Sequence, residues 1–245
     1  LGCAVAFGAL DYPCALAVGL LLGSCAFSLE SLPTVLVLGA LAAALSLLGA
    51  QGHAVLEETD VSPYDGLILP GGADIDPALF GEENWGSRKI ERERDLRQLE
   101  LLDYFVKAKR PVLGVCKGHQ LLNIYFGGTI CQHIPEYARH QWIDRDQAHE
   151  SRCEPGCFLE SLYGLEFPVN SAHHQAVVTP ARGFRAVQWA EDGVLEAMVH
   201  ETLPLFGLQW HPERMCGAHA RPDTVDGLPV FDFFLKLITG EVSLH

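Results

Sequence analysis

The chain has 245 residues, of which 49% are hydrophobic, and its 17 basic and 31 acidic residues give a formal net charge of -14. That length accommodates one large α/β domain or two small ones, and the hydrophobic fraction excludes a disordered chain. So acidic a protein is a poor partner for nucleic acid, whose phosphates require a basic surface.

The N-terminal third is apolar and has no basic residue. No charged residue occurs from position 31 to position 56, and every Lys and Arg lies at Arg88 or later. A membrane helix of about 20 residues would fit this stretch, but neither a signal peptide nor a membrane anchor is expected without flanking basic residues. We therefore favour a buried helix rich in Ala, Leu and Gly, with a membrane-anchored protein as the alternative.

Strands and helices alternate after this stretch. Periods of two and 3.6 residues predict helices at 95–108 and 117–126, and strands at 53–58, Gly66–Leu69, 111–115, 167–178 and 203–213. The short connections between them favour a parallel sheet covered by helices on both faces. Ligands of such sheets bind at the carboxyl ends of the strands, where the motifs described below occur.

Residues 137–160 are expected to form a long loop. Cys153 and Cys157 lie in it after His140 and His149, so a metal site is one interpretation. Their Cys-x3-Cys spacing is not a standard zinc pair, however, and the eight cysteines lack the dense framework of small secreted domains. We favour mostly free thiols in a cytoplasmic protein.

The segment "GVCKGHQ" places Cys116 at the point where a strand becomes a helix. Gly114 and Gly118 flank the thiol and allow close backbone approach. The N–H groups of the helix N-terminus favour a thiolate and can stabilise an oxyanion. A core cysteine is the alternative interpretation of any single free thiol.

Two further motifs strengthen the active-site interpretation. In "WHPE", His211 and Glu213 follow an apolar strand, and alternation along that strand would point both side chains to the same side. The carboxylate can then orient the imidazole, and the imidazole can activate the thiol. In "LPGG", a second tight turn supplies the N–H of Gly72 for an oxyanion.

In combination these motifs resemble the class I glutamine amidotransferase superfamily, and within it the γ-glutamyl-γ-aminobutyrate hydrolase family, the C26 peptidases. The matching segments span 64–213 in the family's order: "LILPGGADIDPALFGE", "RD" at 94–95, "GVCKGHQLLNIYFGGTICQHI", "VNSAHHQAV" and "FGLQWHPE". Of these, "NSAHHQ" and "ADIDPALFGE" favour the hydrolase branch. The resemblance implies a three-layer, flavodoxin-like α/β fold with a mostly parallel sheet and helices on both faces, built as one domain from residues 1–245.

Residues 1–60 are atypical for the family. The resemblance implies a strand, then a helix with a Tyr near its start, then a second strand in this region. The segment "YPCAL" at 12–16 and the stretch after Pro33 are alternative starts for that helix. The long apolar insert between them has no counterpart in the family.

The resemblance also implies roles for individual residues. Cys116 corresponds to the nucleophile, His211 to the acid–base and Glu213 to its orienting partner. The backbone N–H groups of Gly72 and Lys117 correspond to the oxyanion hole. A set of polar residues lies where the family contacts substrate: Gln120, Asn170, Ser171, His174 and Gln175. For the members within 170–175, bracing of the loop is an equal alternative.

The implied reaction is hydrolysis of a small γ-glutamyl amide through a thioester, without a metal or an organic cofactor. The sequence leaves the leaving amine open. A glutaminase subunit that supplies ammonia to a separate synthase is the main alternative, and a non-catalytic binding module of the same fold is another. Homodimers are common in the family, so a homodimer is a further expectation.

Overall fold

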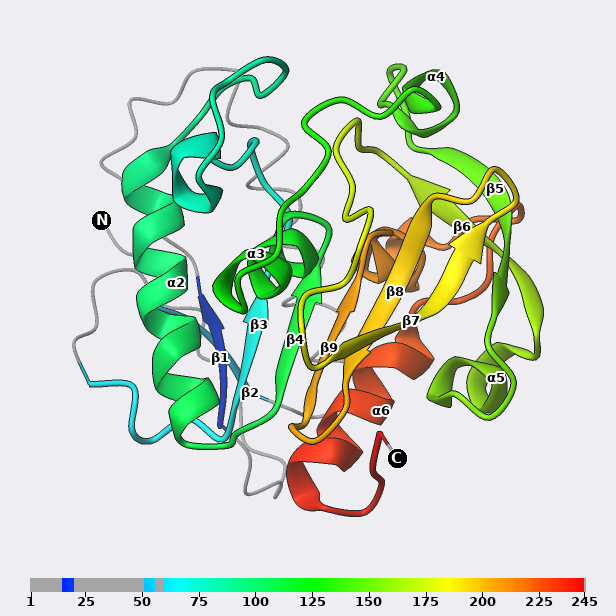
Figure 1. Ribbon diagram of the computed structural model, residues 1–245. Coiled ribbons are helices and arrows are strands. Elements are labelled where there is room, and N and C mark those ends of the chain that lie inside the picture. Colours follow the sequence, from blue (N-terminus) through cyan, green and yellow to red (C-terminus); the bar gives the residue numbers. More distant parts are fainter. Residues whose placement is uncertain (1–14, 20–50, 56–59, 245) are drawn as a thin grey trace.

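The computed structural model describes residues 15–19, 51–55 and 60–244, the first two segments as backbone (Figure 1). Its elements follow one another in the order β1 (Ala15–Gly19), β2 (Gln51–Val55), β3 (Gly66–Leu69), a 3-10 turn η2 (Pro77–Phe80), α2 (Arg92–Lys107), β4 (Val112–Val115), α3 (Lys117–Tyr125), α4 (Tyr137–His140), β5 (Gln147–Cys153), α5 (Phe158–Tyr163), β6 (Glu166–Ser171), β7 (Phe184–Ala190), β8 (Leu195–His200), β9 (Leu205–Leu208), two 3-10 turns η3 (Pro212–Arg214) and η4 (Gly217–His219), and α6 (Leu228–Thr239).

The described strands form one nine-stranded sheet in the order β2-β1-β3-β4-β9-β8-β7-β5-β6. From β2 to β9 the neighbouring strands are parallel. From β9 to β6 they are antiparallel. The predicted α/β class is therefore confirmed, with a sheet divided between a parallel and an antiparallel half. The parallel half ends in the turns that carry Gly72 and Cys116.

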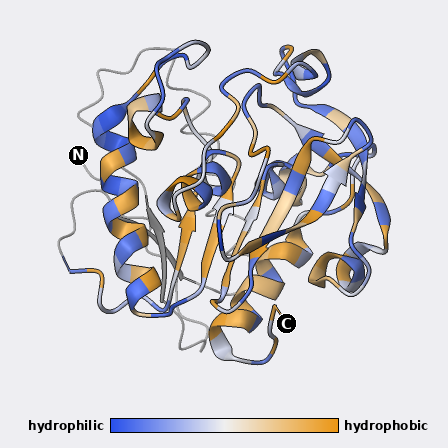
Figure 2. Ribbon diagram, viewed as in Figure 1, coloured by the Kyte–Doolittle hydropathy of each residue, from blue (hydrophilic) through white to orange (hydrophobic). Residues whose placement is uncertain are grey.

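Helices cover both faces of the sheet, because successive strand residues point to opposite sides. On one face, α2 and α3 pack against Leu67, Val112 and Leu205. On the other face, α5 and α6 pack against Ile68, Leu113 and Phe206. Figure 2 shows the resulting hydrophobic colouring of α6 and the central strands. The two cores thus share the same strands.

The predicted loop at 137–160 is wrong, because the segment contains α4, β5 and α5. In β5, "QAHESRC", the inward-facing side chains include His149, Ser151 and Cys153. Burial of Ser151 is tolerated because its hydroxyl has hydrogen-bond partners: it donates to the carbonyl of Phe167 and accepts from the Gln188 amide. Because the buried face carries polar residues, β5 lacks the alternation of hydrophobic and polar residues by which a strand is predicted from sequence.

The N-terminal predictions are only partly covered by the described residues. Ala15–Gly19 is strand β1, so a helix starting within 12–16 is wrong there. Of the stretch 31–56, only Gln51–Val55 is described, and it is strand β2 rather than part of a helix. The alternative start after Pro33 lies outside the described residues. Within the described residues, no helix combines the length and the apolar character needed to cross a membrane.

Candidate active site

Cys116 lies on a strained elbow between β4 and α3. Its backbone has φ 49° and ψ -101°, a conformation that costs a non-glycine residue about 1–3 kcal/mol. The elbow also needs glycine after it: a Cβ on Gly118 would lie 2.1 Å from the carbonyl oxygen of Leu69. The chain therefore turns sharply against the end of β3, and this geometry is typical of an activated nucleophile.

His211 and Glu213 form a buried ion pair beside the elbow. His211 Nδ1 lies 2.7 Å from Glu213 Oε1. The pairing predicted from the sequence is present, but its predicted cause is wrong. Strand β9 ends at Leu208, and Glu213 belongs to the 3-10 turn η3, so a turn and not strand alternation brings the two side chains together.

The imidazole of His211 and the thiol of Cys116 meet at Gly71. A Cβ on Gly71 would lie 2.8 Å from His211 Cε1 and 3.6 Å from Cys116 Cβ. Because Glu213 occupies Nδ1 of His211, the other ring nitrogen is the one available to the thiol. Only glycine leaves room for both side chains at this turn.

The electrostatics favour a charged imidazole. Burial and Arg214 oppose a positive charge on His211, but Glu213 and Cys116 outweigh them and raise its pKa to about 9. Burial acts against a charge on Glu213 as well, and the facing imidazole reverses this, so that the pKa of the carboxyl lies below its ordinary value. The pair is therefore imidazolium and carboxylate near neutral pH.

A buried ion pair joins the two segments assigned to the oxyanion hole. Lys117 Nζ lies 2.5 Å from Asp95 Oδ1, and both side chains are almost fully buried. The other oxygen of Asp95 accepts a hydrogen bond from the backbone N–H of Asp76. Gly72 packs on the Lys117 side chain, since a Cβ there would lie 3.2 Å from Lys117 Cδ. One carboxylate of α2 thus ties the "PGGADID" turn to the elbow.

Gln209 is a site residue that the sequence reasoning did not assign. Its amide Nε2 lies 3.4 Å from Cys116 Sγ, and its Oε1 accepts a hydrogen bond from Gln120 Nε2. Gln120 Nε2 also donates to the carbonyl oxygen of Gln175. Gln209 stands in the quoted motif "FGLQWHPE", which was the available signal. Gln120, expected at the substrate, reaches the thiol through Gln209.

The 170–175 segment braces the site. Asn170 accepts a hydrogen bond from the backbone N–H of His211 and donates to the His211 carbonyl, so its amide holds the histidine main chain on both sides. Ser171 contacts a buried imidazole, that of His140. The contacts of Asn170 and Ser171 therefore agree with the alternative prediction, in which this segment braces the loop and does not contact substrate.

The side chains of His174 and Gln175 instead make hydrogen bonds in the direction of the protein surface. His174 Nε2 lies 2.9 Å from Asp74 Oδ2, two residues beyond Gly72. The Gln175 amide donates to the hydroxyl of Ser87, which lines a surface hollow of about 460 Å³. That hollow is bordered by Asn84, Trp85, Gly86, Ser87, Arg88 and His133. Hydrogen bonds therefore connect a surface hollow with the Gln120–Gln209–Cys116 chain.

Comparison with known proteins shows the family of the chain. The family model of peptidase C26 matches residues 32–213. The chain belongs to the peptidase C26 family. Protein NtpR of Enterococcus hirae is 33% identical over 186 residues, which cover 72% of this chain and 76% of that protein. A γ-glutamyl-γ-aminobutyrate hydrolase of Escherichia coli O157:H7 is 30% identical over 179 residues, which cover 66% of this chain and 70% of that protein.

Two solved structures share the fold of this peptidase C26 protein. A glutamine amidotransferase from Thermotoga maritima matches with a TM-score of 0.59 at 14% identity, over 95% of this chain and 87% of that one. A chain of PurLQS from the same organism matches with a TM-score of 0.62 at 17% identity, over 92% of this chain and 99% of that one. These likenesses confirm the glutamine amidotransferase-like α/β fold.

Proposed function

We propose that the chain is a cysteine-dependent hydrolase of small γ-glutamyl amides. The observation that carries the proposal is the meeting of Cys116 and His211 at Gly71, on a strained elbow and beside a Glu213 carboxylate 2.7 Å from the ring. Nucleophile, base and orienting group in this order are what covalent acyl transfer requires.

In the proposed reaction, Cys116 Sγ attacks the γ-carbonyl carbon and the carbonyl oxygen becomes an oxyanion. The N–H groups of Gly72 and Lys117 are assigned to that oxyanion. His211 donates a proton to the leaving amine as the C–N bond breaks, which gives a γ-glutamyl thioester. His211 then takes a proton from water, the water oxygen attacks the thioester, and glutamate leaves as the thiol regains its proton.

The remaining site residues are positioning groups in this proposal. Asn170 holds the main chain of His211, and Asp95 links the two oxyanion segments through Lys117. Gln209 holds the thiol side of the elbow. The hollow next to Ser87 is the proposed place for the leaving amine, because Gln175 connects its wall to the site.

The experiment that tests this function measures glutamate released from a panel of γ-glutamyl amides by the purified chain alone. We expect hydrolysis of γ-glutamyl-γ-aminobutyrate or a similar amide, at higher kcat/KM than free glutamine, and background activity for Cys116→Ala. Selective hydrolysis of glutamine that rises sharply when a synthase is added would instead support an ammonia-supplying subunit. No release from any amide would overturn both enzyme interpretations.

A further inference from the structure

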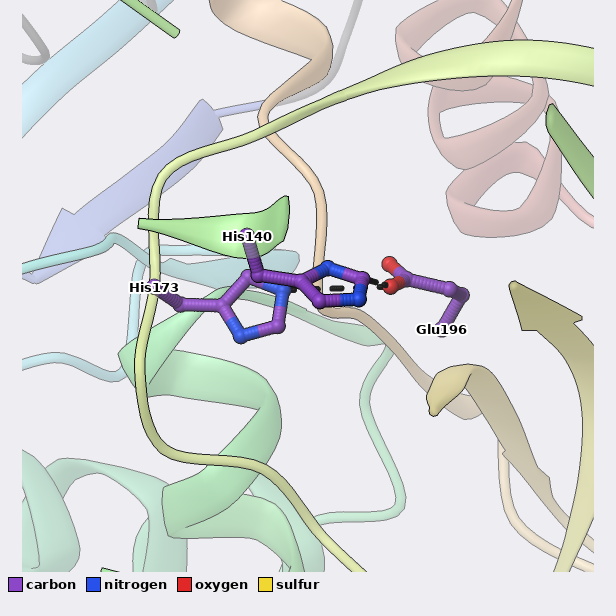
Figure 3. A group of neighbouring side chains, drawn as sticks. All are labelled: His140, His173 and Glu196. Atoms are coloured by element: carbon purple, nitrogen blue, oxygen red, sulfur yellow. Dashed lines mark ion pairs between the residues drawn. The ribbon is translucent and has the colours of Figure 1, made fainter. Parts of the chain in front are cut away.

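A buried group of titratable side chains lies next to the active site and takes no part in the proposed reaction. It consists of His140 at the end of α4, His149 on β5, His173 just after β6, and Glu196 on β8. Glu196 is fully buried, and no imidazole of the group is more than 8% exposed. Figure 3 shows the rings of His140 and His173 converging on the Glu196 carboxylate.

Three imidazole nitrogens surround one oxygen of Glu196. Nδ1 of His140 and Nε2 of His173 each lie 3.8 Å from Glu196 Oε1, and Nε2 of His149 lies 3.3 Å from it. One atom from each of His140, His173 and Glu196 can be chosen so that all lie within 4.8 Å of one another. The three side chains therefore face a common point between them.

The outward nitrogens of these rings are held by acceptors. His173 Nδ1 lies 3.0 Å from the carbonyl oxygen of Gln175, and His140 Nε2 lies 3.1 Å from Asp192 Oδ2. Carbonyl and carboxylate oxygens only accept, so the ring protons sit on those outward nitrogens. Histidines that bind a metal show this pattern, with the second nitrogen donating to a carbonyl or a carboxylate.

The inward atoms of His173 and Glu196 are left without hydrogen-bond partners, whereas His140 Nδ1 lies 2.9 Å from the hydroxyl oxygen of Ser171. Neither His173 Nε2 nor either oxygen of Glu196 has such a partner among the described residues, although all three atoms are buried. Nε2 of His173 therefore lies 3.8 Å from a carboxylate oxygen that has no hydrogen-bond donor among these residues either. A buried polar atom without a partner is costly, so the arrangement calls for a positive species between them.

A metal ion satisfies this geometry. One divalent ion accepts electron pairs from both rings and from Glu196 at once. Zinc ligands at about 2.0–2.2 Å stand about 3.3–3.6 Å apart in a tetrahedron. The separations here, 3.8 Å from each ring to Glu196 and at most 4.8 Å between any two ligand atoms, exceed this, so the side chains must move closer on binding.

We propose that His140, His173 and Glu196 form a buried binding site for a divalent transition-metal ion, best matched by Zn²⁺. Two imidazoles and one carboxylate suit this ion. His149 is a positioning residue here, since its Nε2 lies 3.3 Å from the ligating carboxylate oxygen. The sequence interpretation of a site with Cys153 and Cys157 is replaced, because those thiols face the carbonyls of Gly164 and Val187.

The proposed ion would stabilise the residues that lie beside Cys116. His173 Nδ1 and the Gln120 amide share the Gln175 carbonyl oxygen. The backbone N–H of Gln209 donates to the carbonyl of Glu196. An ion that fixes His173 and Glu196 therefore fixes both residues of the Gln120–Gln209 pair beside Cys116. Its role is structural, and the proposed hydrolysis contains no step on the metal.

The test uses the full chain with Cys116→Ser, because a thiol beside the imidazole of His211 is itself a pair of metal ligands. The protein is stripped with a chelator, loaded with Zn²⁺ or Co²⁺, and dialysed. We expect one retained equivalent, a higher unfolding temperature when loaded, and a tetrahedral cobalt spectrum without a thiolate charge-transfer band. If no equivalent of metal is retained, or if a cobalt–thiolate band appears, the proposal is overturned. Neither result needs a further variant for its interpretation.

Substitutions at the ligands then locate the ion. In the same background, Glu196→Gln and His173→Gln should each weaken binding by more than about a hundredfold, since replacing an outer-shell partner alone typically costs about 10–100-fold. His174→Gln is the matched control, because His174 contacts Asp74 and not the cluster. Circular dichroism confirms that each variant is folded. Equal binding by folded Glu196→Gln or His173→Gln would refute the assignment.

Discussion

At the scale of single residues, each site side chain is set by its immediate surroundings. Cys116 combines a positive φ with the first turn of a helix, and the conformation holds its buried thiol at the edge of the sheet. Burial and Arg214 oppose a charge on His211, and Glu213 and Cys116 favour it. This balance gives the imidazole its charge near neutral pH, and in the proposed reaction Glu213 orients the ring.

The raised pKa of His211 predicts the pH dependence of activity. Above about pH 9 the imidazole loses the proton that the leaving amine needs, so kcat/KM should fall through that value. The raised pKa also makes stability depend on pH in the same direction. The contribution of protonated His211 to the free energy of unfolding is complete below about pH 6.5 and is lost as the pH rises through about 9. A pH–rate profile with no basic limb near pH 9 would contradict this assignment.

Glu213→Gln should separate orientation from chemistry. Glutamine keeps the shape but removes the charge that raises the His211 pKa, so the basic limb should move to lower pH. We expect kcat to fall by about 10²- to 10⁴-fold while remaining above background, whereas Cys116→Ala should reach background. Steady-state kinetics across pH measures both effects. An unshifted limb with full activity would remove Glu213 from the site.

At the scale of elements, α2 acts as a clamp on the two turns of the site. Its Asp95 binds Lys117, the first residue of α3, and the backbone N–H of Asp76 beyond β3. Three elements that are separate in sequence are thus joined by one buried carboxylate. An ion pair without access to water therefore links the two turns.

Asp95→Asn should be strongly destabilising. The change leaves the Lys117 charge buried without its counter-ion, which typically costs about 3–5 kcal/mol. Glu100→Gln on the same helix is the control, since its pair with Arg97 is partly exposed and should contribute about 0–1 kcal/mol. Urea unfolding of both variants gives the comparison. A similar small effect for both would show that the Asp95–Lys117 pair does not clamp the turns.

At the scale of the whole described structure, one sheet supports two cores. Residues of β3, β4 and β9 contribute to both faces, so neither core can be lost without exposing strands of the other. The parallel half supplies the elbow and the glycine turn, and β9 leads into the segment with His211. The site therefore lies where the parallel strands end.

This shared sheet predicts cooperative unfolding. Trp210 is fully buried in one core, whereas Trp85, Trp142 and Trp189 are 61%, 57% and 38% exposed, so the change in tryptophan fluorescence should report mainly on Trp210. We expect its midpoint in urea to coincide with that of far-UV circular dichroism, which reports on both helical layers. A fluorescence midpoint clearly below the circular dichroism midpoint would show that the two cores unfold independently.

Features that depend on neighbouring residues could be predicted from the sequence. Gly66–Leu69 was predicted with its observed bounds, and the predicted helix at 117–126 differs from α3 by one residue. The elbow at Cys116 and the "LPGG" turn were recognisable because glycines and a strand-to-helix change are local signals. The spacing of "WHPE" also brought His211 and Glu213 together as predicted, although through a turn.

Contacts between polar groups that are distant in the sequence could not be predicted and depend on the folded arrangement. Gln120 and Gln209 are 89 positions apart, and Asn170 lies 41 positions from the histidine that it braces. His140 comes from a helix, His173 from a loop and Glu196 from a strand, and the helix lies in the segment that was expected to be a loop. Hydrophobic periodicity records which face of an element is buried, but it carries no information on partners for a polar residue on that face. Those partners are fixed by strand order and packing, which arise only when the chain folds.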